Sequence, residues 1–541
     1  MLPVSFYTLG CKLNQNETEA LSDAFGKEGF TVLPWSFLES KKQVLPENRI
    51  SEAGNSCPLL CIINTCTVTS KAEQKARRVI RLCLRYGCTV LVTGCYAQLE
   101  EKAIKKLADD KKSTGTLFVF PGQGKEKLLD LPCYLVDILR ISNNEGLPVT
   151  KAQLATAIKN FNSEFYLTKT QRHRDSDICE VRSVLCASVP PCEDKREIVS
   201  IDCEKNPFSF NPQHFSFHSR AFLKIQDGCD YSCAYCRVPL ARGKSISLES
   251  QEVLTRLKAL EEKGMAEAVL TGVNICQYAD PENSSRRFPG LLKFLLDNTK
   301  NIAIRLSSIE PNTHCYTPDN TIESEDFFTM LANRRIRPHF HLSVQSGSDS
   351  VLTAMGRDYK AQDIVWMVKK LRTVRDDPFI ACDIITGFPG ETEDDFEQTA
   401  DLCRTVGFAW IHAFPYSRRP GTMAAAVTKG LVSERIAGER LNLLMDYAKS
   451  GKKDYIQRWQ GKIVDAVFEC ASGGDSEKND FFPFFPALTD NYIKVRCVRH
   501  VHGFLNSSYK RIVPGNACRC RIEQIASEIE GGFDAWARLV E

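Results

Sequence analysis

The feature that most constrains the fold is a repeated alternation of short apolar segments with amphipathic ones. In residues 1–121, the apolar segments 59–65 (LLCIINT) and 89–94 (TVLVTG) each precede a segment with helical periodicity. Strands that alternate with helices along a chain are typical of a parallel sheet with helices on its faces. Residues 1–121 are therefore predicted to form a doubly wound α/β domain of the flavodoxin-like kind.

The same alternation continues over residues 216–446. Strands are predicted at 222–226, 267–272, 303–308, 339–345, 379–387 and 409–416. These strand–helix units predict a partial (βα)6 barrel. Because ligands of such barrels bind at the carboxyl ends of the strands, we expect an active site at that end.

The remaining segments have other patterns. Residues 450–525 contain β-rich stretches and no strong helix, which predicts a small β-barrel of OB-like size. Residues 122–215 have weak periodicity and are interpreted as a connector or insertion, to which we assign no function. Residues 526–541 are interpreted as a tail, and residues 35–57 as a surface insertion.

Cysteine is the unusual component of the composition, with 23 residues among 541. The first residues lack the basic and apolar regions of a signal peptide, and no apolar run is long enough to span a membrane, so we expect a cytoplasmic protein. Because the cytosol keeps thiols reduced, most cysteines should be small buried hydrophobes rather than disulfides. A net charge of +3 restricts any basic surface to local patches.

Three cysteines stand close together directly after the first strand of the predicted barrel. Cys229, Cys233 and Cys236 have the spacing C-x3-C-x2-C. Structural zinc usually has four ligands, often as pairs of C-x2-C, and no second pair stands nearby. Cysteine thiolates hold iron–sulfur clusters, and three of them on a four-iron cluster leave one iron open to a substrate or cofactor. The spacing therefore favours a 4Fe-4S cluster, with zinc as the alternative.

Three further cysteines, Cys11, Cys66 and Cys95, each follow a strand of the first domain. In a doubly wound sheet the carboxyl ends of the strands share one edge, where ligands bind. These thiols are therefore expected to converge, although they are far apart in the sequence. The alternative, that each is an ordinary buried cysteine, is weakened by their equivalent positions in successive units.

Several motifs along the chain resemble those of a known family. In order they are TLGCKLNQNE, NTCTVT, TGCYAQ, RAFLKIQDGC, LTGVN, RLSSIEP, HLSVQSGSDSVLTAMGRDY, DIITGFPGETEDDF and HAFPYSRRPGT. Together with the cysteine triplet, they resemble the radical S-adenosylmethionine (SAM) methylthiotransferases. NTCTVT and SSIEP most resemble the branch that acts on threonylcarbamoyladenosine in tRNA.

The resemblance implies a transferase that adds a methylthio group to carbon 2 of N(6)-threonylcarbamoyladenosine at tRNA position 37. It implies that the cysteine triplet holds one 4Fe-4S cluster, on which SAM is cleaved to a 5'-deoxyadenosyl radical. The three strand-end cysteines would hold a second 4Fe-4S cluster that provides sulfur, and two SAM molecules would be used per turnover. Sister branches act on isopentenyladenosine in tRNA or on an aspartate of a ribosomal protein, and these substrates stay open. A non-catalytic RNA-binding or electron-transfer protein is a third alternative, but it does not account for the SAM motifs.

Six more residues are interpreted as SAM-binding: Tyr235, Gly272, Ser308, Glu310, Gln345 and Asp383. Tyr235 would pack against the adenine, the backbone near Gly272 would contact the methionine amine, and the residues after the third barrel strand would bond the ribose. Strand-end polar groups of such barrels tend to be functional. The alternatives are a core aromatic, a tight turn, a cap and a surface salt bridge.

RNA contact is expected from local basic segments. The helix predicted at 70–86 carries six Lys and Arg residues against one acid and begins just after Cys66, so it could hold tRNA phosphates or be a solvated face. Residues 450–525 resemble the RNA-binding TRAM domain of this family, and Arg418 and Arg419 would lie near the active face. The expected partners are the tRNA anticodon stem-loop and an electron donor such as a flavodoxin or ferredoxin. We expect a monomer without membrane contact.

Overall fold

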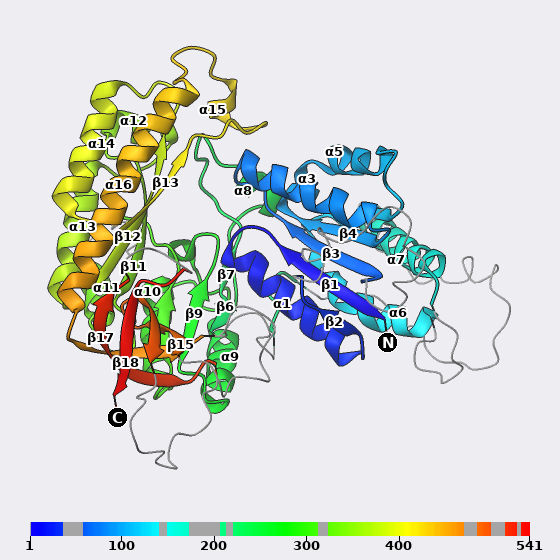
Figure 1. The fold of residues 1–541 in the computed structure, drawn as a ribbon, viewed down its shortest axis with the longest axis horizontal. Coiled ribbons are helices and arrows are strands. Elements are labelled where there is room, and N and C mark those ends of the chain that lie inside the picture. The colour runs from blue at the N-terminus through cyan, green and yellow to red at the C-terminus, as the bar shows by residue number, and fades with distance from the viewer. Residues whose placement is uncertain are drawn as a thin grey trace. The chain divides into compact units, whose positions relative to one another are not determined.

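The chain divides into two compact units (Figure 1). The first runs to residue 214 without residues 68–70, and the second contains those residues and 215–541. The computed structural model describes residues 2–35, 58–139, 149–171, 206–212, 220–311, 323–469, 484–498, 514–526 and 532–540. The insertion predicted at 35–57 therefore lies almost entirely outside the described residues.

The first unit is built on a five-stranded parallel sheet with the order β2-β1-β3-β4-β5. Its strands are β1 (Pro3–Thr8), β2 (Thr31–Leu33), β3 (Leu60–Thr65), β4 (Thr89–Gly94) and β5 (Thr116–Val119). β3 and β4 are buried along their whole length, which explains their uninterrupted apolar sequences. The strand order is that of flavodoxin-like sheets, so the predicted fold class of this unit is confirmed.

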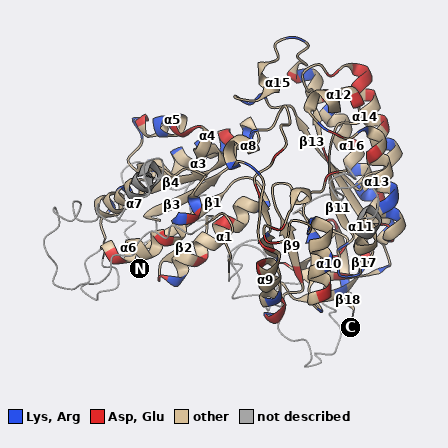
Figure 2. Ribbon diagram, turned by 180° about the vertical axis from the view of Figure 1, so that it is seen from behind, with Lys and Arg blue, Asp and Glu red and all other residues tan. Residues whose placement is uncertain are grey.

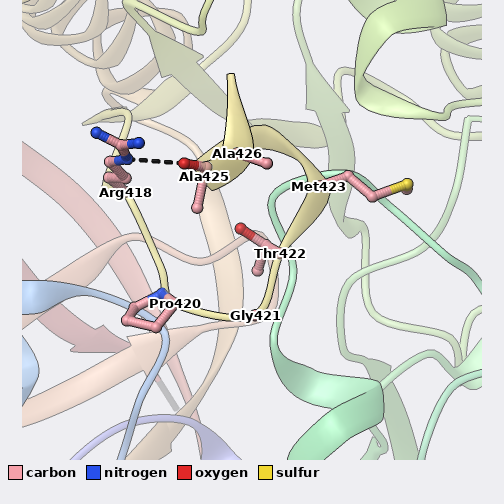
Figure 3. A pocket seen from close by; sticks show the side chains of 7 residues that line it. All are labelled: Arg418, Pro420, Gly421, Thr422, Met423, Ala425 and Ala426. Atoms are coloured by element: carbon pink, nitrogen blue, oxygen red, sulfur yellow. Dashed lines mark hydrogen bonds between the residues drawn. The ribbon is translucent and has the colours of Figure 1, made fainter. Parts of the chain in front are cut away.

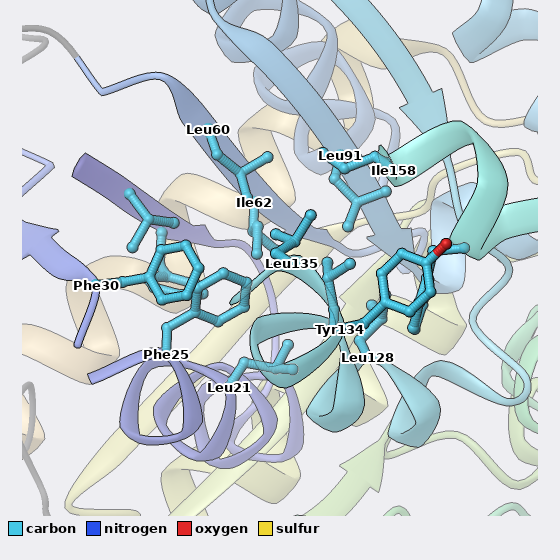
Figure 4. Close-up of a cluster of buried hydrophobic side chains, with 14 of the residues drawn as sticks. Leu21, Phe25, Phe30, Leu60, Ile62, Leu91, Leu128, Tyr134, Leu135 and Ile158 are labelled. Carbon is cyan, nitrogen blue, oxygen red and sulfur yellow. The ribbon is translucent and has the colours of Figure 1, made fainter. Parts of the chain in front are cut away.

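Helices cover both faces of this sheet. They are α1 (Lys12–Lys27), α3 (Ser70–Arg85), α4 (Cys95–Leu99), α5 (Glu101–Lys105), α6 (Leu131–Leu139) and α7 (Lys151–Gln171), with the 3-10 segments η2 (Lys106–Asp109) and η3 (Lys125–Asp130). One buried cluster contains Phe25 of α1, Ile62 of β3 and Leu135 of α6 (Figure 4). A second contains Ile63 of β3 and Ile80 of α3. Because neighbouring strand residues point to opposite faces, the two clusters lie on opposite sides of the sheet.

The core of the first unit extends beyond the predicted boundary at residue 121. Leu128, Leu135 and Ile158 are buried in the same cluster as the strand residues of the sheet. The predicted connector therefore contributes η3, α6 and α7 to this core. The buried residues of α7 include Leu154, Ala157, Ile158 and Phe161, which have helical spacing, although the sequence analysis found only weak periodicity in this segment.

The second unit begins with the predicted partial barrel. Its parallel strands are β6 (Ala221–Lys224), β9 (Glu267–Thr271), β10 (Ala303–Leu306), β11 (His339–Gln345), β12 (Phe379–Thr386) and β13 (Trp410–Pro415). They form two three-stranded sheets, β6-β9-β10 and β11-β12-β13. Bridges from Ile304 to Ile336 and from Ile309 to Leu342 link the two sheets in the expected order. Each predicted strand is thus present, within a few residues of its expected bounds.

Helices and short strands connect these barrel strands. They are the pair β7 (Gln226–Asp227) and β8 (Ile246–Ser247), α8 (Val238–Arg242), α9 (Ser250–Glu262), η6 (Ile275–Gln277), α10 (Phe288–Asn298), α11 (Glu323–Leu331), α12 (Asp349–Met355), α13 (Ala361–Val374), α14 (Glu393–Val406), α15 (Met423–Ala426) and α16 (Glu434–Trp459). Within the described ranges, no helix is both long enough and apolar enough to cross a lipid bilayer.

A closed five-stranded β-barrel ends the chain, as the β-rich sequence predicts. Its strands are β14 (Ile463–Phe468), β15 (Phe484–Thr489), β16 (Lys494–Val498), β17 (Ala517–Ile525) and β18 (Ala535–Val540), in the order β14-β15-β16-β18-β17. Two boundaries differ from the expectation. The segment interpreted as a tail contains β18, which closes the barrel, and residues 450–459 belong to the long helix α16.

A buried ion cluster joins this barrel to the amino ends of the preceding parallel strands. Glu267, the first residue of β9, accepts hydrogen bonds from Arg305 Nε at 2.7 Å and from Arg337 Nε at 2.9 Å. Arg305 also donates to the carbonyl oxygen of Thr489 at 3.2 Å. His339, which begins β11, stacks on Tyr492 with ring centroids 3.8 Å apart. The small barrel is therefore packed against the end of the strands opposite to their carboxyl ends.

The ionic contacts predict how this junction responds to acid. Burial alone would raise the pKa of Glu267, but the charges and hydrogen bonds of Arg305 and Arg337 outweigh it and hold the pKa at about 2. Because this is below the ordinary value of 4.5, the stabilisation is fully present above about pH 4.5 and is lost as the pH falls toward 2. Removing one partner of a buried pair costs about 3–5 kcal/mol.

We therefore expect Glu267→Gln to lower the free energy of unfolding of the second unit at pH 7 by about 3–5 kcal/mol. The difference from the unchanged protein should shrink toward pH 3. Urea unfolding can be followed by the fluorescence of Trp410, Trp459 and Trp536, with Arg435→Ala as a control because that side chain is 73% exposed. Equal destabilisation by Glu267→Gln at pH 7 and at pH 3 would contradict the assignment.

Candidate functional site: two sets of three cysteines

The three strand-end cysteines of the first unit lie at one edge of its sheet. Cys11 follows β1, Cys66 follows β3, and Cys95 begins α4 directly after β4. Because β1, β3 and β4 are neighbours in the sheet, their carboxyl ends place these thiols at adjacent positions. The loops are also tightly packed, since a methyl group on Gly10 would lie 2.9 Å from Cys66 Sγ.

Two buried asparagines hold these loops in place. The amide of Asn14 donates to the carbonyl oxygens of Leu9 at 2.7 Å and Thr65 at 3.2 Å. The amide of Asn64 donates to the carbonyl oxygen of Asn14 at 3.1 Å. The loops after β1 and β3 are thus tied to each other. The sequence analysis did not identify either asparagine, because their role depends on strands that meet only in the fold.

The three thiols differ in their access to solvent. Cys66 is buried, Cys95 is partly buried and Cys11 is exposed. The sheet edge therefore carries three cysteine positions, although among the described residues no group of three or more Cys, His, Asp or Glu side chains is already gathered around a metal position. Such a set suits an iron–sulfur cluster with three protein ligands, because thiolates are the usual ligands and the fourth coordination position stays accessible.

The second set lies in the loop after β7, at the carboxyl end of the first barrel strand. Gly228 begins this loop with a φ of +71°, and a Cβ there would lie 1.9 Å from the carbonyl oxygen of Lys244. Only glycine fits this conformation and this spacing. The amide of the next residue, Cys229, donates to the carbonyl oxygen of Gly243 at 3.1 Å. This close backbone pairing directs the chain into the cysteine loop.

Gln226 joins the cysteine loop to the loop after β9. The side-chain Nε2 of Gln226 donates to the carbonyl oxygen of Gly228 at 2.8 Å. Its Oε1 accepts a hydrogen bond from the backbone N–H of Asn274 at 2.9 Å. Gly272 has to be small here, because a Cβ would lie 2.8 Å from Gln226 Oε1. The predicted position Gly272 is therefore brought beside the cysteine loop.

The surroundings of the cysteine loop disfavour the thiolate forms of two of its cysteines. Burial raises the pKa of Cys229 to about 11 and that of Cys236 to about 12. Charged sulfur is therefore disfavoured in this loop unless a cation offsets the cost. A metal cluster supplies such a charge, and metal binding then releases the thiol protons. The donor set fits a cluster better than it fits a free nucleophile.

Arg357 connects this loop to the strand-end residue Glu310. Its Nη1 donates to Cys233 Sγ at 3.2 Å, and its Nη2 forms an ion pair with Glu310. Glu310 in turn accepts from the side chain of Asn274 at 3.2 Å. Burial raises the pKa of Glu310 despite the nearby guanidinium. Arg357 was not predicted as a site residue, because nothing in the sequence relates it to Cys233, which lies 124 positions away. The backbone near Gly272 was expected at the site, but the side chain of Asn274 was not.

Comparison with known proteins agrees with this geometry. Residues 223–403 match the pattern of the Radical SAM superfamily, and residues 46–114 match an uncharacterized protein family, UPF0004. A threonylcarbamoyladenosine tRNA methylthiotransferase of Treponema pallidum is 41% identical over 87% of this chain and 91% of its own length. One of Bacillus subtilis is 30% identical over 92% of this chain and 90% of its own. The chain belongs to the radical SAM methylthiotransferase family.

Other known proteins are similar to this chain at lower identity. A tRNA-2-methylthio-N(6)-dimethylallyladenosine synthase of Fervidobacterium nodosum is 26% identical over 87% of the chain and 88% of its own length. A solved radical SAM methyltransferase, TsrM of Kitasatospora setae, has 15% identity and a TM-score of 0.44 over 78% of this chain and 77% of its own. Family membership makes the chain an enzyme, and it implies a 4Fe-4S cluster and SAM as cofactors.

The other predicted residues of this methylthiotransferase fall into two groups. Tyr235 packs against the buried cluster that contains Ala234 and Met355, so both roles considered for it stay open. Gln345 ends β11 with a φ of +64°, a strained conformation for a residue with a side chain. Ser308 and Asp383 share one partner, which the sequence analysis missed.

That partner is His341, the third residue of β11. Ser308 Oγ lies 2.7 Å from His341 Nδ1, and Asp383 Oδ1 lies 3.4 Å from His341 Nε2. The ring of His412 approaches His341 edge-on, with centroids 5.2 Å apart. Predicted side chains from β12 and from the segment after β10 are therefore held by a histidine on the strand between them.

Most described cysteines outside the two sets are buried, as predicted. They are Cys61, Cys83, Cys88, Cys276, Cys382, Cys403, Cys497 and Cys520. The cysteines of the predicted connector at positions 179, 186, 192 and 203 lie outside the described residues. Burial raises the pKa values of Cys382 and Cys403, so these two thiols stay protonated.

The backbone around Gly228 leads to a prediction for metal content. Gly228→Ala should lower the iron content of the reconstituted methylthiotransferase by about half, because only one of two proposed clusters is disturbed. Gly438→Ala is the matched control, since a Cβ there meets nothing within 4 Å. Iron and sulfide analysis after anaerobic reconstitution gives the measurement. A Gly228→Ala protein with full iron content would show that the loop does not need this backbone shape.

Proposed function

We propose that this protein adds a methylthio group to carbon 2 of N(6)-threonylcarbamoyladenosine at position 37 of tRNA, next to the anticodon. The observation that carries the proposal is the 41% identity to the Treponema pallidum enzyme over 87% of this chain. The two sets of strand-end cysteines support it, because the reaction needs one site to generate a radical and another to provide sulfur. The identity to the dimethylallyladenosine synthase is lower, at 26%, and this favours threonylcarbamoyladenosine over isopentenyladenosine as the substrate.

In this proposal Cys229, Cys233 and Cys236 would hold a 4Fe-4S cluster that would bind SAM and supply the electron for its cleavage. A second 4Fe-4S cluster is assigned to the strand-end set Cys11, Cys66 and Cys95. When bound, these groups supply a 5'-deoxyadenosyl radical that takes hydrogen from carbon 2 and a methylated sulfur that replaces it, at a cost of two SAM molecules. The protein supplies ligation, orientation and exclusion of water.

The chain's own residues have defined tasks in this scheme. Arg357 donates to Cys233 and would orient that ligand while placing positive charge beside the cluster. Gln226 holds the loop of Gly272 beside the cysteine loop through hydrogen bonds to both loops. A SAM molecule bound next to these loops would therefore contact backbone that is fixed in position. Glu310, buried and bonded to Asn274, would accept hydrogen bonds from SAM hydroxyl or amine groups.

Helix α3 supplies one surface for RNA. Lys71, Lys75, Arg78 and Arg81 are exposed along it, and the helix begins shortly after Cys66 (Figure 2). Arg77 is less available than the sequence analysis assumed, because it donates to the hydroxyl of Tyr96 at 3.0 Å. Exposed cations in a row suit a phosphate backbone, and such contacts fix position without reading sequence.

The C-terminal barrel supplies a second surface of different chemistry. The guanidinium of Arg496 lies 4.5 Å from the ring centroid of Phe484, 4.1 Å from that of Phe533 and 5.9 Å from that of Trp536. Phe484 and Trp536 are partly exposed. Aromatic rings and arginine planes are the groups on which unpaired bases stack. This cluster would therefore hold a base of the anticodon loop.

We propose a cytoplasmic location, with which a tRNA substrate is consistent. A flavodoxin or ferredoxin is proposed as the electron donor, and the functional unit is proposed to be a monomer.

The two cysteine sets should be separable by function. A variant with Cys11, Cys66 and Cys95 changed to Ala should still cleave SAM reductively to 5'-deoxyadenosine, because the other cluster is intact, but it should transfer no methylthio group. The matching variant of Cys229, Cys233 and Cys236 should do neither. Chromatography of the products and iron analysis give the measurement. Methylthio transfer by the first variant would exclude the strand-end set as the sulfur-providing site.

The RNA surfaces should be visible in salt dependence. Changing Lys71, Arg78 and Arg81 to Ala should weaken binding of a threonylcarbamoyladenosine stem-loop and flatten its salt dependence by roughly one unit of slope per lost phosphate contact. Trp536→Ala should weaken binding by about 1–3 kcal/mol with an unchanged slope, because a stacking contact releases no counterions. Fluorescence anisotropy across a salt series distinguishes the two effects. An unchanged affinity in both variants would eliminate these surfaces.

A further inference from the structure

A cavity lies in the segment between β13 and α16. It has a volume of about 680 Å³ and is lined by Arg418, Pro420, Thr422, Met423 and their neighbours up to Ala426 (Figure 3). Its volume is in the range that holds small-molecule groups.

Main-chain contacts hold this cavity beside the cysteine loop. The amide of Ala424 donates to the carbonyl oxygen of Ala234 at 2.8 Å, and Ala234 stands between Cys233 and Cys236. A Cβ on Gly421, in the cavity wall, would lie 3.3 Å from Leu240 in α8. The backbone of the cavity wall is therefore hydrogen-bonded directly to the cysteine loop. A substrate group bound in the cavity would therefore leave the rest of the substrate within reach of the cysteine loop.

The cavity combines one cation with mostly apolar walls. Arg418 Nε donates to the carbonyl oxygen of Ala425 at 2.8 Å, which fixes the guanidinium at one side of the cavity, and Met423 lies at the other side (Figure 3). In the part of the chain that the structure describes, the terminal nitrogens of Arg418 have no hydrogen-bond or ion-pair partner. Arg419, by contrast, is buried. Arg418 therefore presents free donors in a fixed orientation.

The substrates of this enzyme family differ in the chemistry that such a cavity recognises. A threonylcarbamoyl group ends in a carboxylate and also carries a methyl group, whereas an isopentenyl group is a neutral hydrocarbon. A guanidinium pairs with a carboxylate through two parallel hydrogen bonds, which adds geometric specificity. An unpaired arginine would gain nothing from a hydrocarbon.

We propose that this cavity holds the threonylcarbamoyl group of the substrate nucleoside and that Arg418 pairs with its carboxylate. The inference rests on the proposed function and adds a specificity-determining residue to it. Arg418 would select the modified adenosine by its charge, and the apolar wall near Met423 would contact the threonyl methyl group. The competing role for Arg418 is a contact with an RNA phosphate, which would not depend on the carboxylate.

The test compares two stem-loops that differ only at the carboxylate. One carries threonylcarbamoyladenosine, and the other carries its methyl ester. Arg418→Ala should lower kcat/KM for the acid by about 10–100-fold, because a charge-assisted contact is lost. It should change kcat/KM for the ester little, and the unchanged enzyme should prefer the acid by a similar factor. Arg418→Lys should restore part of the preference, and the surface variant Arg435→Ala should keep all of it.

The other possible results overturn either this inference or the proposed function. An equal loss for the acid and the ester in Arg418→Ala assigns the residue to an RNA phosphate and overturns this inference while leaving the proposed function intact. No loss for either substrate overturns it as well. If the unchanged enzyme modifies neither stem-loop but acts on isopentenyladenosine or on a ribosomal-protein peptide, the proposed function itself fails. Iron content measured in every variant verifies that the compared proteins carry equal clusters.

Discussion

Parallel strands direct their carboxyl ends toward a single edge of a sheet, and both cysteine sets of this protein depend on that geometry. In the first unit, β1, β3 and β4 are neighbours, so residues separated by many positions reach the same edge. In the second unit, the cysteine loop follows β6 and β7, and Glu310 follows β10. The same rule brings Gly272, Asn274 and Glu310 around the cysteine loop. No regular spacing in the sequence is needed once the strands are in register.

In the second unit, the cysteine loop and the small β-barrel lie at opposite ends of the parallel strands. The cysteine loop and Glu310 lie toward the carboxyl ends, whereas the ion cluster of Glu267, Arg305 and Arg337 fixes the small barrel at the amino ends. A buried ion cluster is a poor source of net stability, but a partner cannot be removed without leaving an unpaired buried charge. The barrel is therefore a rigid part of this unit, and a bound RNA would have to extend from it toward the cysteine loop.

Much of this arrangement could be predicted from the sequence, because apolar periodicity and cysteine positions are local signals. The strands of both sheets and the closed barrel agree with the expectation, and the structure brings the strand ends of Cys11, Cys66 and Cys95 together. Segments with weak local signals were missed. Among its described side chains α7 has only four buried residues at helical spacing, Leu154, Ala157, Ile158 and Phe161, and the six-residue strand β18 lies within the segment interpreted as a tail. Contacts between side chains that are far apart in the sequence could not be predicted from it. Arg357 lies 124 positions from Cys233, and His341 lies 33 positions from Ser308.

The most direct test of the account is mass analysis of tRNA nucleosides from cells with and without this gene. The account predicts that the 2-methylthio form of threonylcarbamoyladenosine disappears without the gene, while threonylcarbamoyladenosine that lacks the methylthio group accumulates. The unchanged gene should restore it, and a gene with Cys11, Cys66 and Cys95 changed to Ala should not. Loss of the methylthio form of isopentenyladenosine instead, or no change in any tRNA nucleoside, would contradict the account.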